Sequence, residues 1–124
     1  MNAKRKPLSM NAYTVETFDD VAGRLSVASD TGLRFWSPVD AASIHGVLWF
    51  AELQRQVTAA FPDRKALIVL DCGDRGDLAH AAMCEGLRVI CFRGSSVMLE
   101  KLRSIADQLG ATIEAQHPSL ARAD

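Results

Sequence analysis

The sequence predicts a single α/β domain with a mostly parallel sheet of about four strands and helices on both of its faces. Helix-like and strand-like segments alternate along the chain, and such alternation is typical of parallel strands joined by crossover helices. The segments 66–70 and 87–92 carry apolar residues on both faces, as strands do when helices cover a sheet from both sides. The length of 124 residues fits one ordinary domain. These observations favour a three-layer arrangement.

The two ends of the chain are expected to lie outside this domain. Residues 1–16 show no periodicity and carry Pro7 among several charges, so they predict a flexible lead-in. Residues 117–124 read as a C-terminal tail. The α/β domain is therefore expected over residues 17–116.

The first regular pattern begins near residue 18. Val21, Leu25 and Ala28 recur at helical spacing, which predicts a helix over about 18–29. The pattern is bounded by residues that start or stop helices, namely Thr17 or Asp19 before it and Gly32 after it. A strand over 25–28 is the competing prediction for this segment.

The next elements are a short strand and a long helix. The strand is predicted over 33–36 and ends before Pro38, which cannot donate to a sheet ladder. The helix is expected to begin at Asp40 and to run to about Ala60. Its inward stripe at helical spacing is Phe50, Leu53, Val57 and Phe61. Its first turns are apolar nearly all round, which leaves a surface around Ile44–Phe50 for contact with another protein.

The second half of the chain repeats strand and helix twice more. The expected elements are a strand over 66–70, a helix over 77–85, a strand over 87–92, a helix from Ser95 or Ser96 to Leu109, and a weak edge strand over 111–115. Gly86 and Gly110 mark the ends of the two helices. A serine cap precedes the second one, whose stripe includes Leu102 and Ile105.

Composition excludes several classes of function. The chain is 48% hydrophobic and 23% charged, with 14 basic and 15 acidic residues and a formal net charge of −1. Such a balance gives no electrostatic footprint for nucleic acid or for an anionic membrane. The apolar run Val47–Ala51, which no other run exceeds in length, is too short to span a bilayer, and no signal-peptide pattern is present. Neither nucleic acid nor a membrane is therefore expected as a partner.

The three cysteines, Cys72, Cys84 and Cys91, fit neither a disulfide framework nor a zinc motif. Reduced thiols in a cytoplasm are the simplest interpretation. The chain also lacks a G-x-G-x-x-G fingerprint and a P-loop. No metal and no cofactor are therefore expected.

Any chemistry is expected at one edge of the sheet. Ligands of parallel α/β proteins bind outside the carboxyl ends of the strands. Three polar loops fall on that edge, namely 37–40, 71–77 and 93–96. We therefore expect a functional site to draw on these loops.

The segment VLDCGDRGD, residues 69–77, supplies the candidate catalytic residues Asp71 and Cys72. Asp71 at a strand end is suited to act as a general base, and His45 is the histidine best placed to activate the thiol of Cys72. The alternative is structural: Asp71 accepts backbone N–H bonds, and Asp74 and Asp77 stand at the N-cap and N3 positions of the next helix.

The segment FRGSS, residues 92–96, is the candidate anion site. A strand ends, Arg93 and Gly94 follow, and Ser95 and Ser96 begin a helix whose N–H groups favour an anion. The alternative is an arginine in solvent beside an ordinary serine cap. The expected ligand-binding residues are Asp71, Asp74, Arg93, Gly94, Ser95 and Ser96.

The stretch SPVDAASIHGVLWFAEL, followed by FP and IVLDCGDRGDLAHAAMCEGLRV, resembles a group of small, uncharacterised bacterial α/β proteins. That group carries a Ser-Pro-x-x-Ala-Ala turn, a glycine and an aromatic residue in the next helix, and a Leu-Asp-Cys-Gly strand end. The resemblance covers residues 37–92, with Asp40 where the group has a glycine. It implies a parallel α/β fold in which the first two loops matter together, and it implies no activity. The size and class are also similar to those of regulatory STAS-like and receiver-like domains, although the acidic pair and the lysine of a receiver are missing. The expected three-layer arrangement is STAS-like or Rossmann-like.

Two functional hypotheses follow. In the first, a cytoplasmic protein holds a small anionic ligand with Arg93 and the serine-capped helix, while Asp71 orients a hydroxyl or a water. In the second, a non-catalytic interaction or regulatory module uses the surface around Ile44–Phe50. The chain is expected to form a homo-oligomer under the first hypothesis as well. A ligand site needs perturbed titratable groups that converge on a pocket, whereas a module needs an exposed apolar patch. Whether the chain is an enzyme stays open.

Overall fold

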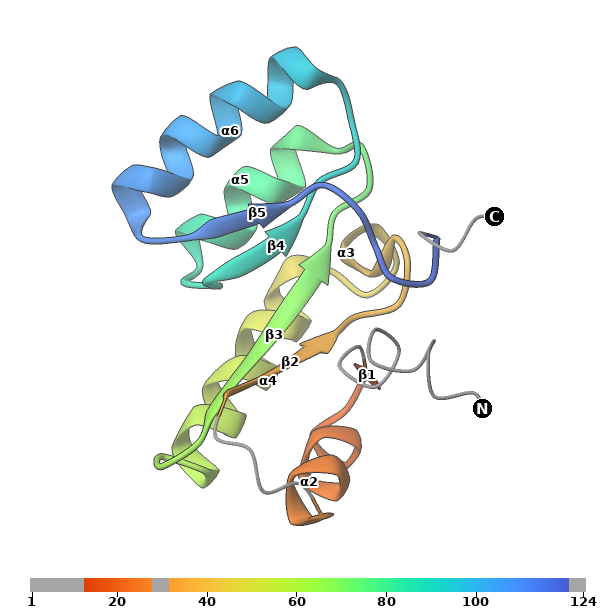
Figure 1. Ribbon diagram of the computed structural model, residues 1–124, viewed down its shortest axis with the longest axis vertical. Coiled ribbons are helices and arrows are strands. Elements are labelled where there is room, and N and C mark those ends of the chain that lie inside the picture. Colours follow the sequence, from red (N-terminus) through yellow and green to blue (C-terminus); the bar gives the residue numbers. More distant parts are fainter. Residues whose placement is uncertain (1–12, 28–31, 121–124) are drawn as a thin grey trace, which may run out of the picture.

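The sheet has five parallel strands that lie side by side in the order of the sequence. A computed structural model describes residues 13–27 and 32–120. The strands are β1 (Tyr13–Thr14), β2 (Gly32–Trp36), β3 (Lys65–Asp71), β4 (Val89–Cys91) and β5 (Thr112–Glu114), and every neighbouring pair is parallel. The helices are α2 (Phe18–Val27), α3 (Ala41–Ile44), α4 (Val47–Ala60), α5 (Gly76–Cys84) and α6 (Ser96–Leu109), as Figure 1 shows. The predicted single-domain parallel α/β class is confirmed.

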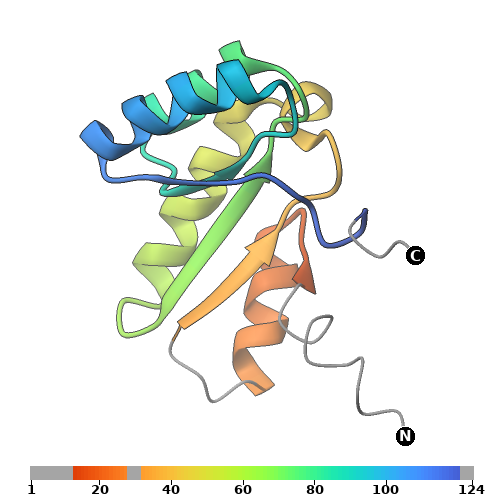
Figure 2. The ribbon, with the colours of Figure 1, turned by 45° about the horizontal axis from the view of Figure 1, so that its top comes forward.

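The helices form one layer on one face of the sheet. Helix α2 packs against α4, α4 against α5, and α5 against α6, and Figure 2 shows them on the same side of the strands. Right-handed crossovers between consecutive strands place every helix on the same face, because helices change face only where the strand order reverses. The prediction of helices on both faces, and with it a three-layer arrangement, is wrong because the strand order contains no reversal.

The face of the sheet opposite the helices carries a separate, smaller apolar cluster. This cluster consists of Trp36, Leu67, Val69, Val89 and Cys91, and it includes no helical residue of the described chain. An ion pair between Arg34 on β2 and Glu114 on β5 reaches across this face. The ring of His117 packs edge-on against Trp36 at 5.2 Å. The apolar character of β3 on both faces thus reflects a second small cluster rather than a second layer of helices.

Helix α2 is confirmed as a helix, against the alternative of a strand. Thr17 caps it: its Oγ1 accepts from the Asp20 N–H at 3.2 Å, and Asp20 Oδ2 accepts in return from the Thr17 N–H at 3.1 Å. This reciprocal pair is a capping box with aspartate in the glutamate position. Val21 and Leu25 are its buried residues. The helix spans Phe18–Val27, and Gly32, the residue predicted to stop it, is the first residue of β2. Residues 28–31 lie outside the described part of the chain.

The long helix expected over 40–60 is two helices. Helix α3 ends at Ile44, and α4 begins at Val47 after Gly46, whose φ is +96°. That backbone conformation is open to glycine and closed to most other residues, so the helix breaks there. The break turns Phe50, Leu53 and Val57 of α4 into the core.

Both chain ends contribute more to the fold than the sequence predicted. Strand β1 pairs with Phe35 and Trp36, and Val15 is 1% exposed, so residues 13–16 do not belong to a lead-in. His117 is also 1% exposed, although it was assigned to a tail. Residues 1–12 and 121–124 lie outside the described chain. No helix within the described residues is long and apolar enough to cross a bilayer.

A side chain takes the place of a strand at one edge of β3. Strand β4 begins at Val89, opposite Val69, so the first half of β3 has no strand partner on that side. The Gln54 side chain accepts from the Ile68 N–H at 2.8 Å and donates to the Ala66 carbonyl at 3.0 Å. Helix α4 is thereby fixed to β3 by two hydrogen bonds in addition to apolar packing.

Candidate functional site

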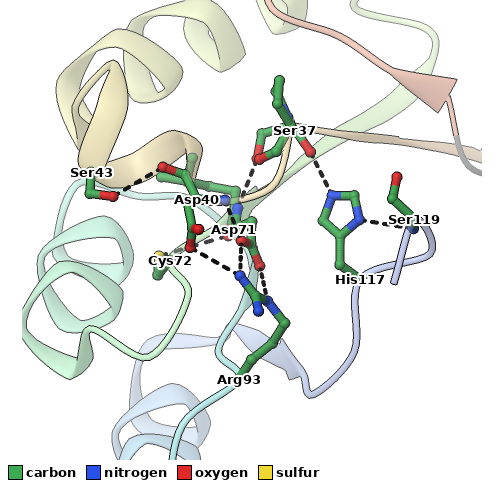
Figure 3. Close-up of polar contacts among 10 residues, drawn as sticks. Ser37, Asp40, Ser43, Asp71, Cys72, Arg93, His117 and Ser119 are labelled. Atoms are coloured by element: carbon green, nitrogen blue, oxygen red, sulfur yellow. Dashed lines mark hydrogen bonds and ion pairs between the residues drawn. The ribbon is translucent and has the colours of Figure 1, made fainter. Parts of the chain in front are cut away.

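Asp71 is the centre of the polar site at the carboxyl ends of the strands. It ends β3 and is fully buried. Arg93 donates to it twice, from Nε to Oδ1 at 3.0 Å and from Nη2 to Oδ2 at 2.8 Å. The Asp40 N–H also donates to Oδ2, at 2.6 Å. The buried carboxylate is therefore satisfied by three donors from two other loops, as Figure 3 shows.

Asp40 completes the cluster from the loop after β2. Its carboxylate accepts from Arg93 Nη2 at 3.0 Å, and its φ is +61°, the left-handed region. Asp40 stands where the resembled group has a glycine, and aspartate is among the residues that tolerate this conformation. Gly73, at φ +59°, lies so close that an added Cβ would overlap Asp40 Oδ1. The three loops predicted to share an edge therefore do meet, through Asp40, Gly73 and Arg93.

Ser37 and His117 extend the hydrogen-bond network of the Asp71 cluster. The buried Ser37 Oγ accepts from the Asp71 N–H at 2.8 Å and donates to the Pro38 carbonyl at 3.0 Å. His117 Nε2 lies 2.7 Å from the Ser37 carbonyl, and its Nδ1 accepts from the Ser119 N–H at 3.1 Å. Since a carbonyl only accepts and an N–H only donates, the His117 proton is on Nε2. Sequence reasoning missed His117, because no local signal links it to a loop 80 positions earlier.

The electrostatics of the cluster favour a charged pair at neutral pH. Burial acts to raise the pKa of Asp71, but hydrogen bonds from Arg93, from the Asp40 N–H and from the Cys91 thiol, together with the Arg93 charge, hold it below its ordinary value. Hydrogen bonds to Asp71 raise the pKa of Arg93 in turn. Two carboxylates therefore face one guanidinium, and the cluster carries a net charge of −1 at neutral pH.

Cys72 is not placed as an activated nucleophile. It is 2% exposed, and burial, reinforced by the charges of Asp71 and Asp77, raises its pKa to about 12. Activated thiols have a lowered pKa and a base within hydrogen-bond reach. The candidate base His45 instead contacts Glu16, with Nε2 3.2 Å from Oε2. The Cys72–His45 pair considered from the sequence is not assembled.

The other predicted ligand-binding residues have structural roles. Ser95 caps α6 by accepting from the Met98 N–H at 3.2 Å. Gly94 packs on the Phe92 ring so closely that a Cβ would overlap it. Ser96 is the first residue of α6 and is exposed. In the described chain no hydrogen bond joins these residues to Asp71.

Asp74 is not the N-cap of α5, although the sequence predicts it there. Arg75 occupies the N-cap position of α5, without a side-chain cap bond, so Asp74 and Asp77 stand one position earlier and two positions later. Asp74 is exposed, and Arg75 instead donates to Asp77 from Nε at 3.0 Å and Nη2 at 2.8 Å. Of the predicted site residues, the structure brings together Asp71 and Arg93. They bind each other, so the arginine is not an open anion receptor in solvent.

A second surface lies where α3 meets α4. Ile44, Leu48 and Trp49 are 68%, 67% and 51% exposed, and we call these three residues the α3–α4 strip. The Trp49 indole donates from Nε1 to the Glu16 carbonyl at 2.9 Å and stacks on the His45 ring at 6.0 Å. The strip is thus apolar, and its Trp49 ring is held in position.

Two hollows flank α4. One, of about 400 Å³, lies beside the turn 85–87, and the other, of about 220 Å³, lies between α2 and α4. Neither is lined by a residue of the Asp71 cluster. Within the described residues, no group of three or more histidine, cysteine, aspartate or glutamate side chains is placed to hold a metal ion. No protein-family model, curated protein or solved structure matches the chain.

Proposed function

We propose that the chain is a non-catalytic interaction module that pairs with a second copy of itself through the α3–α4 strip. One observation carries the proposal: three large apolar side chains in sequence neighbourhood are each more than half exposed. Single exposed apolar residues are ordinary, whereas a group of them is typical of a protein–protein contact. Trp49 is also a residue type enriched at the energetic centres of interfaces.

Pairing with a second copy fits the chemistry of the strip. In a two-fold contact the same surface faces itself, so charged residues at its centre meet like charges. The strip itself contains no charged residue, and the carboxylates beside it are paired, Glu16 with His45 and Glu52 with Arg55. An apolar strip of this kind is self-complementary without an unpaired charge.

Two features of the strand edge support a non-catalytic role. The Asp71 carboxylate is fully used by Arg93 and Asp40. The thiols of Cys72 and Cys91 have raised pKa values because of burial. All three cysteines are free, which supports a reducing, cytoplasmic compartment as part of the proposal. The edge then serves as a rigid support for the loop that leads into α3.

Sedimentation equilibrium tests the pairing. We expect wild type to sediment as a dimer and Leu48→Ser to dissociate, because a symmetric contact loses two buried leucines at once. At about 1.5 kcal/mol for each side chain, dissociation should become roughly a hundredfold easier. Val97→Ser is the matched control, since Val97 is 65% exposed on α6, away from the strip. A monomeric wild type, or a dimer that survives Leu48→Ser, would overturn the proposal.

A second candidate is the binding of a small anion at the outer side of Arg93. Its specific observation is that Nη1 has no partner within the described chain, while the side chain is 23% exposed. A carboxylate or phosphate oxygen could accept from this nitrogen, with Asp71 fixing the guanidinium in place. The net charge of −1 opposes such binding, so we rank it second.

Nuclear magnetic resonance tests the second candidate. Titration with phosphate at constant ionic strength should shift the Arg93 side-chain signal to saturation and leave Arg75, the exposed arginine of the neighbouring loop, unchanged. Equal shifts at both arginines would mean non-specific screening and would reject the site.

A further inference from the structure

The hollow between α2 and α4 shares Trp49 with the α3–α4 strip, but neither functional proposal uses its other lining residues. It measures about 220 Å³, and its lining residues are Thr17, Phe18, Trp49, Glu52, Leu53 and Gln56. Two aromatic rings and one carboxylate thus surround the space, and no basic side chain lines it. Three of the six lining residues are apolar and three are polar, so apolar walls stand beside groups that can orient a small ligand.

The aromatic walls are held in position by their own contacts. The Trp49 indole donates its N–H to the Glu16 carbonyl, and its ring stacks on His45 at 6.0 Å with 28° between the planes. Phe18 stacks on Phe61 at 6.1 Å. A fixed ring with an exposed face loses little conformational entropy on binding, and the face of an indole attracts cations more strongly than any other side-chain ring.

The charge around the hollow is negative. Segments 16–24 and 49–56, which contain its lining, hold four carboxylates and two guanidinium groups. Hydrogen bonds from Arg55 and Gln56 lower the pKa of Glu52, so this carboxylate is charged at neutral pH. Glu16 adds a second carboxylate close to Trp49, through its contact with His45.

We propose that this hollow is a binding site for an organic cation, with the charged group over the Trp49 ring and near the Glu52 carboxylate. The ligand chemistry is an alkylated ammonium or a guanidinium, which either a free metabolite or the side chain of a partner protein can supply. The pairing of aromatic ring and carboxylate is the chemistry that recognises such groups. The site rests on the hollow and on the charges around it. It shares Trp49 with the α3–α4 strip but goes beyond the proposed self-pairing.

Indole signals of Trp49 and Trp36 provide the test. Trp36 is 7% exposed on the helix-free face of the sheet, so it serves as an internal reference. Tetramethylammonium chloride is titrated into the full chain at constant ionic strength, and tert-butanol serves as a neutral probe of similar shape. We expect a saturating shift of Trp49 alone, with tetramethylammonium alone.

Two variants separate the contributions. Glu52→Gln keeps the size of the side chain and removes its charge, so the dissociation constant should rise about twofold to fivefold, as for the loss of an exposed ion pair. Leu48→Ser leaves the lining intact and tests binding in a chain that should not self-pair. If Leu48→Ser binds tetramethylammonium and wild type is a monomer, the cation site is supported and self-pairing is rejected. If wild type is a dimer and neither protein binds the cation, self-pairing is supported and the cation site is rejected.

Capped arginine and lysine amides form the second arm of the experiment. Tighter binding of these amides than of tetramethylammonium points to a partner's side chain, and the opposite order points to a free cation. An unmoved Trp49 signal, an equal response to tert-butanol, or an unchanged affinity in Glu52→Gln would each overturn the proposal.

Discussion

Arg93 binds Asp71 at two points, although 22 positions separate them in the chain, and the guanidinium retains 23% exposure while the carboxylate has none. The pair joins the loop after β4 to the end of β3, and Asp40 adds the loop after β2. Removal of one partner from a buried pair leaves an uncompensated charge, and such a loss is larger than the net contribution of the pair itself.

Arg93→Met should therefore destabilise the fold by about 3–5 kcal/mol in urea unfolding. The double variant Arg93→Met with Asp71→Asn should lose less than the sum of the two single losses, because the unpaired charge is then absent. Arg75→Met is the matched control: its pair with Asp77 is exposed, and its effect should stay within about 0.5 kcal/mol. Additive single effects would contradict the pairing.

The stability of the fold should fall in acid, and Asp71 should account for part of that fall. Its pKa in the folded chain lies below its ordinary value, whereas the unfolded value is about 3.9. Its contribution is thus complete above about pH 5 and is lost as the pH falls through 3.9 towards the folded value. Urea unfolding at pH 7 and pH 3 should show a larger difference for wild type than for Asp71→Asn. Parallel losses in the two proteins would contradict the assignment.

Gly73 and Asp40 should be energetically coupled. Gly73→Ala should destabilise by about 2–3 kcal/mol, because it places a side chain at φ +59° and against the Asp40 carboxylate. In an Asp40→Gly background the same substitution should be at least about 1 kcal/mol milder, since the overlapping carboxylate is gone. A double-mutant cycle in urea measures this coupling. An equal effect of Gly73→Ala in both backgrounds would show that backbone strain alone is responsible.

Gln54→Leu should destabilise by about 1–3 kcal/mol, because the Ile68 N–H and the Ala66 carbonyl lose their partners at the open edge of β3. Hydrogen exchange of the Ile68 amide should accelerate in the same variant. Gln56→Leu is the control, since Gln56 bonds the exposed Glu52 on the outside of the same helix. Unchanged exchange at Ile68 would contradict the strand-like role of Gln54.

The secondary structure could be predicted from local patterns, because its causes are local. The αL glycine at Gly110 and the Ser95 cap lie at the expected ends of α6. The apolar run of β3 lies where expected, as does the Thr17 cap of α2. The break at Gly46 could not be predicted with the same ease, because a lone glycine is often tolerated within a helix.

The layer arrangement and the chemistry of the strand edge depend on contacts between residues that are far apart in the sequence, which local patterns do not show. A two-sided apolar strand is compatible with helices on both faces and equally with a second cluster such as the one under Trp36. Asp71 and Arg93 were correctly expected at one edge, but their sequence positions do not show that they satisfy each other rather than a ligand. His117 contributes through a contact with Ser37 that only the folded chain creates.

The self-pairing proposal is tested most directly by isotope-filtered nuclear Overhauser spectroscopy on a mixture of labelled and unlabelled chains. We predict contacts between the Leu48 and Ile44 methyl groups of one copy and the Leu48 methyls or Trp49 indole of the other. Val97 and Leu109 on α6, which are also exposed, should show no such contacts. Contacts confined to α6, or a sample without intermolecular contacts at millimolar concentration, would contradict the proposal.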